Sequence, residues 1–314
     1  MNRAVINLQR AIFVGLALCG FVLPAGGATY QLLSPDQSMV GHTGIYLTAK
    51  DETLLDTARR YGFGYTEFMA ANRGVDPWLS PEGTSVSLPG LHILPDADRR
   101  GVVINLASQR LFYFPAGEKK VVTFPIGISR PGRDTPLGKT SVVRKAANPT
   151  WYPPPSARAD DPSLPGVVPP GPDNPLGGYA LYLGWPRYLI HGTNKPDGVG
   201  RTVSNGCVRL YPEDIAQIFE QVPVGTPVQV MHQEALVTWI GENLYAQVFP
   251  TKKQADEISI HGYFTSSVPS SELKDRVIAA MKQRDVAINW EAVDKAGLER
   301  SGLPVLIGQA SNAF

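Results

Sequence analysis

Residues 101–126, GVVINLASQRLFYFPAGEKKVVTFPI, decide the fold class. Apolar side chains alternate from Val102 to Leu106, and two further short apolar runs lie on either side of Ala116-Gly117. Alternation with a period of two, broken by turn residues, is typical of strands. Strands are therefore expected at 102–106, 110–114, 120–126, 139–144 and 228–231. Short strands in this number predict a mainly β domain, either a β-sandwich or a partly closed barrel.

Length and composition limit the remaining possibilities. The chain has 314 residues, more than one hydrophobic core usually organises, so two or three domains are expected. Hydrophobic residues make up 43% and charged residues 18%, which is ordinary for a folded chain and argues against disorder. The formal net charge of +1 provides no strongly basic face, so nucleic acid is not expected as a partner.

Residues 1–28 have the order of an export signal. Arg3 and Arg10 supply positive charge, an apolar run occupies 11–23, and small residues lead up to Ala28. The run is too short for a stable membrane anchor. A buried first helix is the alternative. We expect cleavage after Ala28 and a periplasmic protein, with a formal net charge that falls from +1 to −1 because the signal carries two arginines and no acid.

The chain holds two cysteines, Cys19 and Cys207. Removal of the signal leaves Cys207 as the single thiol of the mature chain, so no internal disulfide is expected. An exported protein exposes such a thiol to oxidation, which favours a chemical role over a structural one. Lipid attachment at Cys19 is an alternative to cleavage after Ala28, although Leu18 is bulkier than such sites normally allow.

Residues 42–92 have the pattern of a small α+β module. A strand at 45–48, helices at 51–62 and 65–72 and a closing strand at 85–89 are expected, with Asp51 or Thr53 as the first cap. This order resembles a LysM module, which binds the glycan of peptidoglycan. A packing domain without affinity for sugar is the alternative. The resemblance rests on Asp51, Thr53, Leu54, Ala58, Tyr61, Gly62, Ala70, Asn72 and Leu88-Pro89.

Proline and glycine are dense in residues 148–178. A disordered linker is one reading of this segment. Trp151, Tyr152 and several aliphatic residues give it enough apolar surface to pack, and long ordered loops often cover binding sites. We expect a loop over the active site, with Trp151 and Tyr152 against the substrate.

Residues 233–314 are expected to form a small C-terminal α+β domain. A strand at 244–249 and helices at 271–284 and 290–296 follow from their apolar patterns. The segment carries no chemical motif, so an architectural role is expected. The chain also has no glycine-rich phosphate loop, and no cofactor is expected.

The chemistry is concentrated in residues 189–210. His191 and Cys207 lie sixteen positions apart at the ends of short apolar segments, and a glycine-rich turn between them can bring them together. A nearby imidazole lowers the pKa of a thiol and accepts its proton, so Cys207 is expected to be mostly thiolate near neutral pH. The N–H groups of Gly206 and Cys207 are candidates for stabilising an oxyanion. Arg209 is a candidate for binding a substrate carboxylate through two hydrogen bonds.

Each of these residues has an ordinary alternative. A lone cysteine is often a small buried hydrophobe, and a lone histidine is often a hydrogen-bonded core residue. Their occurrence together favours catalysis. A metal site is not expected, because the remaining histidines are isolated from His191 and Cys207. Those histidines are His42, His92, His232 and His261.

The phrases around these residues resemble a known family. His191-Gly192 followed by Ser204-Asn205-Gly206-Cys207-Val208-Arg209 is similar to the signature of the YkuD-type L,D-transpeptidase catalytic domain, in the branch with ErfK and YbiS. The resemblance places this domain at 99–232 and implies a β-sandwich-like fold. Many members carry histidine where this chain has Asn205. Similar phrases occur at 135–138, 148–151, 169–176 and 211–215.

The resemblance implies acyl transfer on peptidoglycan stem peptides. Cys207 attacks the carbonyl between meso-diaminopimelate and the terminal D-alanine, and His191 transfers the proton, oriented by the carbonyl of Gly192. Ser204, Asn205 and Arg209 contact the substrate. The thioester passes to an amine, either another diaminopimelate, which gives a 3→3 cross-link, or a lysine of an outer-membrane lipoprotein. Some relatives hydrolyse such links, and carbapenems acylate the family.

Other functions remain possible alternatives. An L,D-carboxypeptidase of the same family would pass the acyl group to water. A sortase usually separates histidine and cysteine more widely, and a papain-like or NlpC-like peptidase places cysteine before histidine. A wall-binding protein without activity would use the LysM-like residues 42–92 and keep the catalytic fold as a scaffold. The intact set of Cys207, His191 and Arg209 speaks against this last reading.

Overall fold

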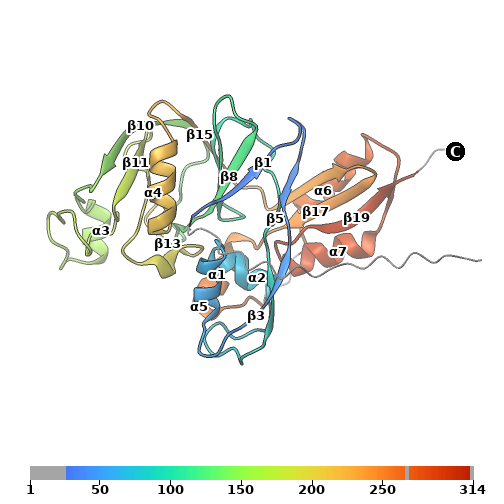
Figure 1. Ribbon diagram of the computed structural model, residues 1–314, viewed down its shortest axis with the longest axis horizontal. Coiled ribbons are helices and arrows are strands. Elements are labelled where there is room, and N and C mark those ends of the chain that lie inside the picture. The colour runs from blue at the N-terminus through green and yellow to red at the C-terminus, as the bar shows by residue number, and fades with distance from the viewer. Residues whose placement is uncertain (1–25, 266–268, 312–314) are drawn as a thin grey trace, which may run out of the picture.

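The computed structural model describes residues 26–265 and 269–311. The export signal expected at 1–28, including Cys19, therefore lies outside the described residues except for Gly26, Gly27 and Ala28. Figure 1 shows three groups of elements: a curled sheet with α3 and α4 beside it, a group of α1, α2 and α5, and a group of strands with α6 and α7. In the two ranges that are described, no helix combines the length and the apolar character that crossing a membrane requires.

The main sheet has nine strands in the order β1-β8-β7-β6-β15-β10-β11-β12-β14. Neighbouring strands are antiparallel except for β15 beside β6 and β14 beside β12, which are parallel. Four of the expected strands, at 102–106, 110–114, 120–126 and 228–231, are confirmed with shifts of one residue. The strand expected at 139–144 extends further. The bounds are β1 (Ala28–Gln31), β6 (Gly101–Asn105), β7 (Arg110–Phe114), β8 (Lys120–Pro125), β10 (Gly138–Ala147), β11 (Tyr179–Leu183), β12 (Leu189–His191), β14 (Val208–Arg209) and β15 (Pro227–Met231).

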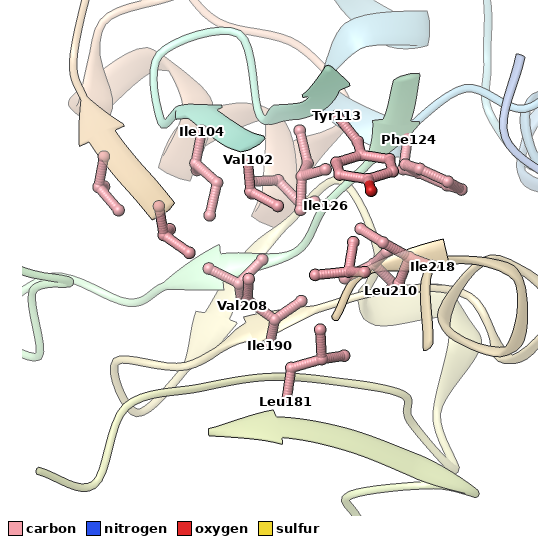
Figure 2. Close-up of a cluster of buried hydrophobic side chains, with 14 of the residues drawn as sticks. Val102, Ile104, Tyr113, Phe124, Ile126, Leu181, Ile190, Val208, Leu210 and Ile218 are labelled. Carbon is pink, nitrogen blue, oxygen red and sulfur yellow. The ribbon is translucent and has the colours of Figure 1, made fainter. Parts of the chain in front are cut away.

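The sheet curls until its two halves face each other across one core. Val102 and Phe124 from one half pack in the same cluster as Leu181 and Ile190 from the other, as Figure 2 shows. Helix α4 (Pro212–Gln221) packs Ile215 and Ile218, which are fully buried, into this cluster. The expected mainly β class is confirmed. The curl brings β12 and β14, at the end of the sheet, over the same core as β6 and β7.

The N-terminal segment has the expected order of strand, two helices and strand. Its elements are β3 (Gly44–Leu47), α1 (Leu54–Arg60), α2 (Tyr65–Ala71) and β4 (Ser85–Leu88), with β2 (Met39–Gly41) paired to β5 (Leu91–Ile93) outside them. Thr53 is the cap of α1, because its hydroxyl accepts a hydrogen bond from Asp56 N and its own backbone N–H donates to the Asp56 carboxylate. These contacts describe a fold, and the LysM resemblance stays a prediction.

The C-terminal residues divide between two packing partners. Strands β16 (Ala235–Ile240), β17 (Asn243–Val248), β18 (Val286–Ile288) and β19 (Val305–Ala310) form one sheet, which packs against α6 (Ser271–Met281) and α7 (Trp290–Glu299). Helix α5 (Lys252–His261) is not part of that core. Its Ile258 packs in the cluster of α1 and α2, so one helix of the expected C-terminal domain completes the N-terminal segment.

A buried ion pair fastens α2 to the main sheet. Arg110 on β7 donates to both carboxylate oxygens of Glu67 on α2, at 3.1 and 2.7 Å, and also to Thr123 Oγ1 and Gly62 O. His92 Nδ1 lies 3.8 Å from Glu67 Oε1. Because the guanidinium and carboxylate satisfy each other away from water, they fix how the N-terminal segment sits on the sheet.

Candidate active site

Two parallel strands place His191 and Arg209 side by side. In the β12–β14 ladder His191 is the register partner of Arg209, and Leu210 N donates to His191 O at 2.9 Å. Arg209 is further held by paired backbone hydrogen bonds with Gly127. Since β14 begins at Val208, Cys207 directly precedes it and lies next to Leu189. The fifteen residues between the histidine and the cysteine, 192–206, are therefore closed into one loop by the sheet itself.

That loop is held from outside by the N-terminal segment. It contains a short 3₁₀ turn at Pro196–Gly198 and β13 (Thr202–Ser204), which pairs with β9 (Ile128–Ser129). Tyr65 N and Thr66 N, at the start of α2, donate to the carbonyls of Val199 and Gly200. Gly200 has φ of +77°, and a Cβ there would lie 2.1 Å from Tyr65 N. The close approach of the two backbones therefore requires glycine.

The turn that carries Cys207 is fixed by hydrogen bonds on both sides. Ser204 Oγ donates to Cys207 O at 2.5 Å, and Thr135 Oγ1 donates to Gly206 O at 2.9 Å. Gly206 has φ of +110°, and a Cβ on it would lie 2.9 Å from the Tyr188 ring. Glycine at this position therefore lets the turn form against the ring.

His191 is buried, and its ring is oriented by the next residue along the chain. Nδ1 lies 2.6 Å from Gly192 O, so in the neutral ring Nδ1 carries the proton and Nε2 keeps its lone pair. This is the contact on which the expected role of Gly192 depends. The role itself remains a prediction.

The protonation states differ from the expected thiolate and imidazolium. Burial, helped by the positive charge of Arg209, lowers the pKa of His191 to about 3, against hydrogen bonds with the Gly192 and Leu176 backbones. Burial also raises the pKa of the Cys207 thiol, although Leu189 N–H and Arg209 act in the opposite direction. For the imidazolium and for the thiolate, the loss of hydration on burial outweighs the stabilisation that neighbouring groups provide. These pKa shifts contradict the expected resting thiolate and favour a neutral thiol beside a neutral imidazole.

A cleft of about 1010 Å³ gathers most of the expected site residues. Cys207 Sγ lies 3.5 Å from Arg187 O at its wall, and Arg209 Nε is buried without a hydrogen-bond partner. Gly192 and Gly206 do not line the cleft. Within 26–265 and 269–311 no group of three or more candidate metal ligands is found. The expected residues that line the cleft are Trp151, Tyr152, His191, Ser204, Asn205, Cys207 and Arg209.

The proline-rich segment 148–178 forms one wall of the cleft. Trp151 pairs with Val168 across the segment, and Asn174 donates to the carbonyls of Pro149 and Pro169, so the loop is internally braced. It also contains a short helix, α3 (Pro155–Asp160), whose Asp160 forms an ion pair with Arg133 at 3.3 Å.

Several residues of the cleft were not predicted from the sequence. Arg144 and Tyr182 lie on β10 and β11, and Arg187 and Tyr188 lie in the turn before β12. The short apolar run Tyr179–Leu183 could have indicated a strand there, but no motif marks these side chains as functional. Their place at the site depends on the order of strands in the sheet.

Comparison with known proteins assigns the family. Residues 99–230 match YkuD, described as the L,D-transpeptidase catalytic domain. The probable L,D-transpeptidase YbiS of Escherichia coli K12 is 44% identical to this chain over 97% of its length and 99% of the relative. The chain belongs to the L,D-transpeptidase family. The probable L,D-transpeptidase ErfK/SrfK of the same strain is 37% identical over 94% of this chain and 97% of its own.

The family assignment covers the flanking segments as well as the site. Both L,D-transpeptidase relatives align over nearly the whole chain, so this protein is a transpeptidase enzyme with the same overall extent. Among solved structures, L,D-transpeptidase 3 from Mycobacterium tuberculosis is 19% identical and covers 68% of this chain and 98% of its own, with a TM-score of 0.33.

Proposed function

We propose that this L,D-transpeptidase joins peptidoglycan stem peptides to amines through a thioester on Cys207. The observation that carries the proposal is that His191, Cys207 and Arg209 line one cleft at the ends of two paired strands. The family membership supplies the class of reaction. The cleft supplies a nucleophile, a base that is unprotonated at neutral pH, and a cation.

The first step is attack on the donor. Cys207 Sγ bonds to the diaminopimelate carbonyl carbon, and the bond from that carbon to the D-alanine nitrogen breaks. Because the resting thiol and imidazole are neutral, the proton moves to His191 Nε2 as attack proceeds and then to the leaving amine. Gly192 O holds the other ring nitrogen throughout, at 2.6 Å in the resting site.

The developing oxyanion needs donors that are already in place. The N–H groups of Gly206 and Cys207 are held by the turn in which Ser204 and Thr135 bind the neighbouring carbonyls. Preorganised donors of this kind stabilise the transition state without rearrangement. Arg209, which couples electrostatically to both His191 and Cys207, binds a carboxylate close to the reacting bond.

The second step is transfer. An acceptor amine attacks the thioester carbonyl, the carbon–sulfur bond breaks, and the amine proton returns to sulfur through His191. The acceptor is a diaminopimelate of another stem or a lysine of an outer-membrane lipoprotein. The braced segment 148–178 favours an amine over water, because Trp151 and Tyr152 help to enclose the thioester.

Covalent chemistry at Cys207 is tested with a carbapenem and with sacculi. The wild-type protein is expected to gain the mass of one carbapenem and to change the muropeptides seen by mass spectrometry. Cys207→Ala abolishes both effects, whereas Ser301→Ala, a change far from Cys207 in the chain, retains both. An adduct that persists in Cys207→Ala overturns the assignment of the nucleophile.

Transfer and hydrolysis are separated by the products formed from a tetrapeptide donor. With a labelled diaminopimelate acceptor or a lipoprotein lysine peptide present, the wild type is expected to give mainly the amide. A variant with a short flexible linker in place of residues 148–178 shifts toward free tripeptide. Tripeptide alone from the wild type would make the enzyme an L,D-carboxypeptidase.

Export and glycan binding complete the proposal. We infer a periplasmic enzyme cut after Ala28, and sequencing of the mature N-terminus tests this, since an intact Met1 contradicts it. We also infer that the LysM-like residues 42–92 bind glycan. Alkylation of Cys207 is then expected to stop turnover and leave binding to sacculi unchanged, whereas a purely wall-binding protein shows no turnover to lose.

A further inference from the structure

The cleft has a second functional end, away from Cys207. Its floor is formed by β10, β11, β12 and β14, which lie side by side in that order. Arg144 is the register partner of Tyr182, and Tyr182 is the partner of Leu189. The parallel register of Ile190 with Val208 puts Leu189 opposite Cys207. Arg144, Tyr182, Leu189 and Cys207 therefore form one row across the sheet, and all four line the cleft.

The guanidinium of Arg144 is oriented but has no acid to neutralise it. Its Cζ lies 3.5 Å from the centroid of the Tyr182 ring. Among residues 26–265 and 269–311, no carboxylate forms an ion pair with it, whereas Arg133 is paired with Asp160. A guanidinium that lies flat on an aromatic ring keeps its edge free for a bidentate carboxylate.

The charges of the lining make the cleft a site for anions. The described residues that line it include four arginines, at 133, 144, 187 and 209, and one acid, Asp134. Asp134 is itself paired with Lys252. A ligand with a single carboxylate, bound by Arg209, would leave Arg144 at the other end of the row without a counter-charge.

The row also fixes the distance between the two ends. Neighbouring strands lie roughly 5 Å apart, so the Arg144 guanidinium, over Tyr182 on β11, is about 10 Å across the sheet from Cys207 on β14. An extended peptide advances about 3.5 Å for every three backbone bonds, so about nine bonds cover this distance. In a stem peptide whose diaminopimelate carbonyl carbon is at Cys207, the path through the γ-linked glutamate reaches its free carboxyl carbon in seven bonds, and the hydrogen bond to the guanidinium spans the remainder.

We propose that Arg144, held on Tyr182, is a specificity-determining residue that binds the free carboxylate of the donor residue preceding diaminopimelate. The inference rests on the proposed function and deepens it, because it makes the enzyme selective for donors in which this carboxylate is free over donors in which it is amidated. Arg209 binds the carboxylate next to the reacting bond, and Arg144 binds the carboxylate of the residue that precedes diaminopimelate.

Two tetrapeptide donors that differ only in this group, free acid or amide, provide the test. The rate of D-alanine release in the acylation step reports on the donor alone. For the wild type, amidation is expected to lower kcat/KM about tenfold to a hundredfold, mainly through KM, as loss of a charge-assisted hydrogen bond does. Arg144→Gln loses a similar factor with the free acid and becomes indifferent to amidation. Arg144→Lys keeps the charge without the planar fork and is intermediate.

Arg158→Gln is the matched control, because Arg158 is an exposed arginine of segment 148–178 that does not line the cleft. This variant is expected to discriminate between the two donors as the wild type does. All variants are expected to unfold at the same temperature as the wild type. The subsite is overturned if D-alanine is released but the wild type and Arg144→Gln discriminate equally between the acid and the amide donor, or if the wild type does not discriminate between them. Absence of D-alanine release from either donor with the wild type overturns the proposed function instead.

Discussion

Arg110→Met tests how the N-terminal segment is fastened to the curled sheet. In the part of the chain that the structure describes, Arg110 is the largest fully buried side chain, and its guanidinium makes four hydrogen bonds, two of them to Glu67. The Glu67 side chain is only 10% exposed. Removing the arginine leaves a buried carboxylate unpaired, which costs about 3–5 kcal/mol of the free energy of unfolding.

His92 gives this prediction a dependence on pH. Burial, and then the charge of Arg110, hold the pKa of His92 well below its usual range. On acidification the imidazole of His92 is protonated at a higher pH in the unfolded state than in the folded state. His92 therefore lowers the stability of the wild type as pH falls below about 6.5. Without Arg110, His92 is free to become protonated and to pair with Glu67, 3.8 Å away. The variant therefore loses less stability on acidification, and the difference from wild type shrinks between about pH 7.5 and pH 5.5.

Urea unfolding at the two pH values measures both effects. Lys139→Met is the control, because Lys139 forms an ion pair with Asp98 at 3.0 Å in which the two side chains are 70% and 77% exposed, so its loss costs less than about 1 kcal/mol. The double variant Glu67→Met with Arg110→Met recovers part of the loss, since apolar side chains of similar volume replace the pair. A cost for Arg110→Met as small as the control's, or one that grows as pH falls, would refute the reasoning.

Three further predictions concern the site and its support. The rate at which a small alkylating agent labels Cys207 is expected to be low at neutral pH and to increase only at a higher pH than for a free cysteine, because burial raises the pKa of the Cys207 thiol. Full labelling at pH 6 contradicts this. Burial also raises the pKa of Asp214 to about 8, so the contribution of this carboxyl to the free energy of unfolding falls from pH 4 to pH 8. Asp214→Asn is therefore expected to gain at least about 1 kcal/mol relative to the wild type over this range, measured by urea unfolding. Gly200→Ala is expected to force the loop away from Tyr65 and to lower kcat about tenfold or more, a loss of roughly 1.4 kcal/mol in transition-state stabilisation. Gly225→Ala is the control and is expected to leave kcat unchanged, because Gly225 also has a positive φ but no close neighbour.

Local patterns account for what the sequence could predict. The strands at 110–114 and 228–231 were marked by apolar runs between turn residues, and both are present. Helix α5 was missed although its signals are ordinary ones: Thr251 forms a capping box with Gln254, and Gly262 ends the helix in the left-handed conformation. A search for caps as well as apolar stripes would have found it.

Long-range features were beyond such patterns. The place of Arg144 in the row with Cys207 depends on four strands and a register that no local motif specifies. The thiolate expectation failed for a related reason. The pair of His191 and Cys207 is visible in the sequence. The burial that favours the neutral form of both side chains arises only when the sheet has curled around them, and so does the effect of Arg209, whose charge lowers the pKa of His191.

The hydrogen bonds from Tyr65 and Thr66 to Val199 and Gly200 have a consequence for the ancestry and engineering of the chain. Modules that flank a catalytic domain are commonly treated as interchangeable parts joined to it by linkers. Here the start of α2 completes the backbone of the loop between His191 and Cys207. A chimaera that replaces residues 42–92 with a foreign module would retain His191, Cys207 and Arg209 and still lack the two donors that hold this loop, so the two parts cannot be exchanged independently.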